Sequence, residues 1–94
     1  MFQVGTTVFH MEHPTPTPRE IAAAVSHRMD IAGVSLREVS RETNIPLTTL
    51  TRRLNGSPFL STELAALASL FGVPVSRLVS EAESIAVATD SGAA

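Results

Sequence analysis

Four polar residues recur at helical spacing in the middle of this 94-residue chain. Thr51, Arg52 and Asn55 follow Thr48 at three, four and seven positions, which places all four on one face of a helix. Together they offer two hydroxyls, a guanidinium and an amide. Arginine is the usual bidentate partner of guanine, and threonine contacts other base edges through its hydroxyl or methyl group. This face therefore predicts recognition of duplex DNA.

The other side of the same segment is apolar. Leu47, Leu50 and Leu54 fall within about 60° of one another on a helical projection, so we expect them to face a core. Leu47 begins the helix, where a core role and a DNA contact are both open. Arg53 points away from both faces, which suits a DNA phosphate or a surface carboxylate. For Arg52 the alternative to a base contact is a solvated surface arginine.

A short preceding helix must position this segment. Ser35 and Glu38 form a capping box that starts a helix of about eight residues. Asn44 tolerates the left-handed conformation that ends such a helix. Pro46 then opens the next helix, which closes at Gly56. Two short helices joined by a turn of three or four residues form a helix-turn-helix.

Three further helices are predicted around this pair. The first follows a capping box at residues 17–20 and stops at Gly33. The second runs from its cap at Ser61 to Gly72, with apolar residues at helical spacing. The last covers residues from 74 to about 83. The expected fold class is therefore an all-α, five-helix bundle.

The two ends of the chain are expected to lie outside this bundle. Residues 1–17 are predicted to form an N-terminal arm and a stiff Pro-Thr linker, the arm being either a short strand or disordered. Residues 18–83 form the predicted DNA-binding domain. Residues 84–94 are predicted to fray as a tail, with a strand at 85–89 as the alternative.

Composition limits the class of protein further. All seven basic residues are Arg, and the net charge is −2. Residues 35–56 nevertheless hold four Arg against two Glu, a local net charge of +2 that suits phosphate. The absence of Cys excludes disulfides, a thiolate zinc site and a Cys nucleophile. The sequence has neither an apolar run long enough for a membrane span nor a leader pattern, which favours a cytoplasmic protein.

The other residues that could bind a metal or act in catalysis do not form a metal or catalytic site. His10, Glu12 and His13 are of metal-ligand type, but they fall in the arm, so we expect no metal. A Ser, a His and an Asp within residues 26–30 share one helix, which cannot give the geometry of a catalytic triad. We therefore expect no enzyme and no cofactor.

Residues 21–80 resemble the lambda-repressor/Cro (XRE-like) superfamily of helix-turn-helix domains, in the branch found in actinobacteria and their phages. The resemblance rests on Thr-Leu-Thr-Arg-Arg-Leu-Asn-Gly at 49–56, Pro-Phe at 58–59, Glu-Leu-Ala at 63–65 and Leu-Phe-Gly-Val-Pro at 70–74. It implies a five-helix bundle whose third helix, about residues 46–55, enters the major groove.

The resemblance also implies roles for individual residues. The residues expected to read bases are Leu47, Thr48, Thr51 and Arg52. The residues expected to contact phosphates are Ser35, Arg37, Arg53, Asn55 and Ser57.

Several positions depart from the family pattern. Leu36 stands where the family commonly has Gln, so the DNA contact of that amide is absent. Ser40 replaces the usual Ala, and we expect its hydroxyl to bond a carbonyl one turn back. Thr43 and Asn44 replace the usual Leu and Gly, and Pro46 replaces a frequent Ser or Thr.

These observations predict a sequence-specific transcriptional regulator of the phage repressor/Cro type, which represses by occluding an operator. It would be cytoplasmic and associated with the nucleoid, in the host cytoplasm if it is phage-encoded. We expect a homodimer, because one domain has few cations. The last helix and the apolar residues of the arm are candidate dimer surfaces. The alternative is an antitoxin or another protein-interaction module on the same bundle, which Leu36, the acidic net charge and the apolar arm favour.

Overall fold

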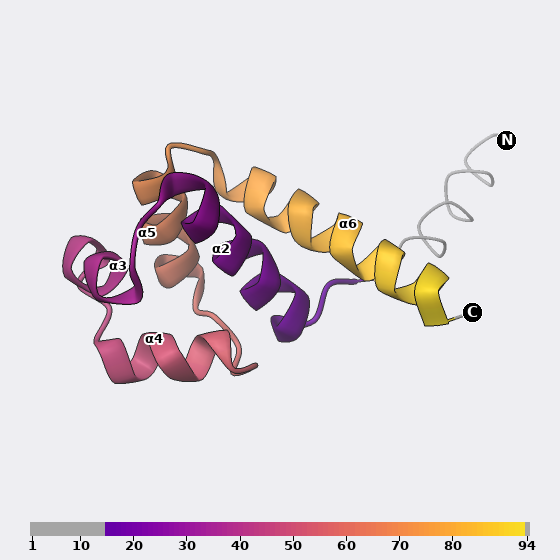
Figure 1. Ribbon diagram of the computed structural model, residues 1–94, viewed down its shortest axis with the longest axis horizontal. Coiled ribbons are helices and arrows are strands. Elements are labelled where there is room, and N and C mark those ends of the chain that lie inside the picture. The colour runs from indigo at the N-terminus through magenta and orange to yellow at the C-terminus, as the bar shows by residue number, and fades with distance from the viewer. Residues whose placement is uncertain (1–14, 94) are drawn as a thin grey trace, which may run out of the picture.

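Five helices account for most of the chain in the computed structural model, which describes residues 15–93 and the side chains of residues 15–88 (Figure 1). They are α2 (Pro18–Ala32), α3 (Leu36–Thr43), α4 (Leu47–Leu54), α5 (Ser61–Phe71) and α6 (Val75–Ala93). Residues 15–93 contain no strand. The predicted all-helical bundle with a helix-turn-helix is confirmed.

Local signals in the sequence set most of the helix ends. At the start of α2, the Glu20 carboxylate accepts the Thr17 backbone N–H at 2.8 Å. Gly33 ends the same helix with φ +70°, and its N–H donates to the Met29 carbonyl at 2.8 Å. Gly72 ends α5 in the same left-handed conformation, which a residue with a Cβ adopts at a cost.

The predicted cap of α5 is wrong by one residue. Leu60 occupies the N-cap position, and Ser61 is the first residue of the helix. The Glu63 carboxylate explains the shift, because its Oε1 accepts the Leu60 backbone N–H at 2.9 Å. That hydrogen bond satisfies the cap residue without help from a serine hydroxyl.

The predicted C-terminal tail is also wrong for the residues that the structure describes. α6 continues without a break through Glu83 to Ala93, so residues 84–93 neither fray nor form a strand. Ala82 and Ala86 stand one helical turn apart and are buried at 0% and 6% exposure. Their small side chains let α6 lie close against α2, so the apolar stripe carries the helix beyond the expected end. The predicted arm, with His10, Glu12 and His13, lies outside the described residues up to residue 14.

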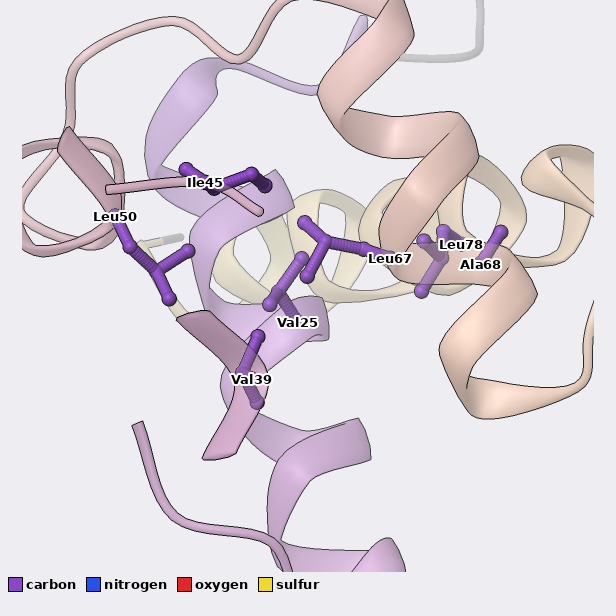
Figure 2. Packing of buried hydrophobic residues seen from close by; sticks show 7 residues of the cluster. All are labelled: Val25, Val39, Ile45, Leu50, Leu67, Ala68 and Leu78. Carbon is purple, nitrogen blue, oxygen red and sulfur yellow. The ribbon is translucent and has the colours of Figure 1, made fainter. Parts of the chain in front are cut away.

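All five helices contribute to one hydrophobic core. Figure 2 shows its seven buried residues, which come from every helix and from the turn after α3. They are Val25, Val39, Ile45, Leu50, Leu67, Ala68 and Leu78. Leu36 and Phe59 are partly buried and pack against this cluster. Leu36 therefore supports the core.

The packing leaves α4 at an edge of the molecule. α2 lies in the middle and packs against α4, α5 and α6. Figure 1 shows α4 along one edge and α6 on the opposite side of α2. In the described part of the chain no single helix is long and apolar enough to cross a membrane; α5 and residues 75–88 reach that length and hydropathy only jointly, across a 99° bend.

Candidate nucleic-acid interface

The turn between α3 and α4 is closed by side chains of α3. Asn44 takes the left-handed conformation, with φ +63°, and its N–H donates to the Ser40 carbonyl at 2.9 Å. The Thr43 hydroxyl donates to the Val39 carbonyl at 2.6 Å and accepts the Ile45 N–H at 3.3 Å. The last of these bonds pairs the Ile45 N–H, a backbone group beside the core that would otherwise be left unsatisfied. The left-handed conformation predicted at Asn44 is confirmed.

Ser40 acts differently from the prediction. Its hydroxyl donates forward to the Ile45 carbonyl at 2.6 Å, and not to a carbonyl one turn back. The forward bond crosses the turn and joins α3 to the residue before Pro46. Thr43, one turn before the start of α4, is the residue that makes the backward bond.

α4 is held by its inner face and exposes its outer face. Leu50 is fully buried, and Leu47 and Leu54 are half-buried. The four polar residues of the outer face, Thr48, Thr51, Arg52 and Asn55, are all exposed. The predicted division of this helix into a core side and a solvent side is therefore confirmed. The helix itself runs along an edge of the bundle (Figure 1).

Internal hydrogen bonds determine what this face offers a ligand. The Thr51 hydroxyl donates to the Leu47 carbonyl at 2.8 Å, so its hydrogen is used within the helix. Outward it presents lone pairs and a methyl group, which suit an exocyclic amino group or the thymine methyl. The Arg52 Nη2 donates weakly to the Thr49 hydroxyl at 3.4 Å. That contact leaves most donors of the guanidinium directed at solvent.

Arg53 pairs with a carboxylate, one of the two partners predicted for it. Its Nε donates to Glu63 Oε1 at 2.8 Å and its Nη2 to Glu63 Oε2 at 3.1 Å. Its Nη1 donates to the Ser57 hydroxyl at 3.2 Å. The side chains of Arg53 and Glu63 are only 16% and 11% exposed. Hydrogen bonding from Arg53 lowers the pKa of Glu63, and the same contact raises the pKa of Arg53.

Sequence reasoning missed Glu63 as the partner in this pair. The signal was present, because Glu63 is the third residue of α5, where a carboxylate commonly folds back toward the helix start. The sequence does not show that the end of α4 lies beside that helix start. Only the fold brings positions 53 and 63 together.

The candidate phosphate contacts on α3 lie at its first turn. The Ser35 hydroxyl accepts the Glu38 N–H at 3.1 Å, while Glu38 Oε1 accepts the Ser35 N–H at 2.9 Å. The predicted capping box is confirmed. Arg37 is exposed in the same turn, on a helix that packs directly against α4. The exposed guanidiniums of Arg37 and Arg52 therefore project from two adjoining helices.

Two other hollows lie on the described residues. One, of about 340 Å³, is an open depression on α6 lined by Ser80, Glu83, Ser84 and Val87. The other is a shallow, open depression of about 270 Å³ between the turn and the start of α5. It is smaller than ordinary small-molecule pockets, which hold about 300–1,000 Å³. Among the described side chains, residues 15–88, no group of three could hold a metal ion.

One solved structure establishes the fold independently. The crystal structure of the clp gene regulator ClgR from Corynebacterium glutamicum matches this chain with a TM-score of 0.71 and 24% sequence identity. The match covers 85% of this chain and 90% of that chain. No protein-family model and no curated protein matches the sequence.

Proposed function

We propose that this protein is a sequence-specific, DNA-binding transcriptional regulator whose helix α4 reads base edges in the major groove. The observation that carries the proposal is the exposed row of Thr48, Thr51 and Arg52 on the face of α4 opposite buried Leu50. That helix is the second of a helix-turn-helix, the element that enters the major groove in such proteins. The fold shared with the regulator ClgR supports the same function.

Contacts divide into base-reading and phosphate-binding groups. In this proposal Arg52 binds a guanine edge, Thr48 and Thr51 contact neighbouring bases, and half-buried Leu47 adds an apolar contact. Arg37 and Asn55 contact phosphates, together with the hydroxyls of Ser35 and Ser57. Since few cations are available, the logarithm of affinity should fall only shallowly with salt, by about 0.9 per phosphate neutralised.

Regulation in this proposal is repression by occlusion, as in phage repressor/Cro proteins of actinobacteria or their phages, acting in the cytoplasm. A weak single domain gains affinity by binding two half-sites about 34 Å apart as a homodimer. α6 exposes Val75 and Val87, at 36% and 44%, and is the candidate dimer surface. Sedimentation that shows only monomer, with and without operator DNA, removes the dimer from the proposal.

The deciding experiment is selection of bound duplexes from a random DNA pool at moderate salt. The wild type and Arg52→Ala are compared, with Arg77→Ala as the matched control. Arg77 is also exposed and lies on α6, which does not pack closely against α4, so its loss removes the same charge and should leave the base preference unchanged. We expect an enriched motif whose guanine preference Arg52→Ala weakens by about 1–3 kcal/mol.

Two results would overturn the proposal. One is a folded wild-type protein that enriches no sequence. The other is a motif that Arg52→Ala leaves unchanged while the helical content stays intact. Absence of any enrichment would favour the protein-interaction alternative, and a pull-down from the host would follow.

A further inference from the structure

The C-terminal end of α4 has little backbone packing to hold it against α5. α4 packs against α2 and α3, whereas α5 packs against α2, α3 and α6. The loop of residues 55–60 joins α4 to α5. The path of this loop therefore determines where the last turn of α4 lies relative to the bundle. That turn carries Arg52 and leads to Asn55, two of the proposed DNA contacts.

A single ion pair ties this loop at three points. Glu63 Oε1 accepts both the Arg53 Nε at 2.8 Å and the Leu60 N–H at 2.9 Å, while Oε2 accepts the Arg53 Nη2 at 3.1 Å. The remaining Arg53 Nη1 donates to the Ser57 hydroxyl at 3.2 Å. The network therefore connects the end of α4, the middle of the loop and the start of α5.

We propose that the Arg53–Glu63 pair is a positioning device for DNA recognition, which sets the place of the last turn of α4 and of the loop, and that Arg53 does not itself bind a phosphate. This inference rests on the proposed function. A bidentate fork fixes orientation because two parallel hydrogen bonds leave the guanidinium little freedom to rotate. The low exposure of both side chains limits competition from water.

If Arg53 is instead a phosphate ligand, removing the Glu63 charge should have the opposite effect on DNA binding. To reach a phosphate, Arg53 would have to leave Glu63 and Ser57. The abandoned carboxylate would then repel the DNA backbone. Loss of the Glu63 charge should strengthen DNA binding if Arg53 is a phosphate ligand, and weaken it if the pair is a positioning device.

Glu63→Gln separates the two roles. The glutamine oxygen can still accept the Leu60 N–H, so the start of α5 is retained while the ion pair is lost. If the pair is a positioning device, Glu63→Gln should bind the operator about fivefold more weakly than the wild type, although the substitution removes a negative charge. Glu81→Gln is the matched control, because it breaks a similar part-buried pair with Arg28 between α2 and α6, away from α4. Its operator affinity should stay within error of the wild type.

Two variants of Arg53 give a readout that a loss of stability alone would not produce. If the pair is a positioning device, Arg53→Gln should weaken DNA binding without changing the slope of log affinity against log salt concentration. If Arg53 is a phosphate ligand, its loss should lower the magnitude of that slope by about 0.9. Arg53→Lys keeps the positive charge but cannot form the two parallel hydrogen bonds to Glu63. A positioning role therefore predicts that lysine does not restore binding, whereas lysine would largely replace arginine as a phosphate ligand. All measurements are made well below the unfolding temperature of each variant.

Amide hydrogen exchange on the DNA-free protein provides a test that does not depend on the proposed function. Glu63→Gln should lower protection at the amides of Gly56 and Ser57, which donate to the carbonyls of Arg53 and Arg52, and leave α2 and α6 unchanged. If the wild type selects DNA, equal or tighter operator binding by Glu63→Gln, or a lower salt slope in Arg53→Gln, overturns the inference. If the wild type selects no DNA, the proposed function fails, and unchanged exchange in the loop would overturn the positioning role separately.

Discussion

The Ser40 hydroxyl donates to the Ile45 carbonyl across the turn of the helix-turn-helix, at an Oγ to O distance of 2.6 Å. Ile45 is buried, with only 6% of its surface exposed, so its carbonyl has restricted access to water. Serine at this position therefore does more than fill space beside the core. It supplies the partner of a backbone group that the turn itself leaves unpaired.

Replacing Ser40 by alanine should lower the free energy of unfolding by about 1 kcal/mol, since the Ile45 carbonyl loses its partner. Urea denaturation followed by circular dichroism measures the effect. Ser26→Ala is the control, because Ser26 is exposed on α2, and it should change stability by less than about 0.5 kcal/mol. Equal stability of Ser40→Ala and wild type would show that the bond across the turn contributes nothing.

Asn44 is the only non-glycine residue with positive φ among the described residues. Asn44→Ala should cost about 1 kcal/mol, because a Cβ without a local hydrogen-bonding group is strained in the left-handed region. Asn44→Gly should be at least as stable as the wild type, since glycine carries no such strain. Thermal unfolding of the two variants side by side measures the difference. A glycine variant less stable than the alanine variant would contradict this account of the turn.

Local chemistry explains which features were predictable from the sequence. Capping residues, glycines and prolines act within a few positions of themselves, so the bounds of α3 and the left-handed Asn44 follow directly. The division of α4 into Leu50 and Arg52 faces follows from helical periodicity alone. These features define the two helices and the turn of the candidate interface.

Long-range packing explains what was missed. The length of α6 depends on alanines that meet α2, a contact between residues more than fifty positions apart in the chain. Alanine carries little hydrophobic signal by itself, so Ala82 and Ala86 did not mark a buried face. The partner of Arg53 was equally hidden, because Glu63 satisfies a local capping pattern as well as a distant arginine.

Shortening the chain after Glu83 tests the extension of α6. Removal of residues 84–94 deletes buried Ala86 and half-buried Ile85, and should lower the free energy of unfolding by about 1–2 kcal/mol. Ser84→Ala in the full-length chain is the control, since Ser84 is exposed and its replacement should be nearly neutral. An unchanged urea midpoint in the shortened chain would mean that this part of α6 adds no stability.

Acid should destabilise the fold through its paired carboxylates. The pKa of Glu63 is lowered by hydrogen bonding from Arg53, and that of Glu81 by hydrogen bonding from Arg28, each from an ordinary value of 4.5. The Thr17 hydroxyl lowers the pKa of Glu20 in the same direction. A carboxyl whose pKa is lower in the folded state adds stability above its unfolded pKa, and loses it as the pH falls through the folded value.

The free energy of unfolding should therefore decline as the pH drops below about 5, where the unfolded chain begins to take up protons that the folded chain still excludes. Urea midpoints measured at intervals from neutral pH down to about pH 3 give the profile. Glu81→Gln should start from a lower stability and show a shallower decline, since one of the paired carboxylates no longer titrates. A wild-type midpoint that stays constant through this range, or a Glu81→Gln profile parallel to it, would contradict the assignment of this pH dependence to the ion pairs.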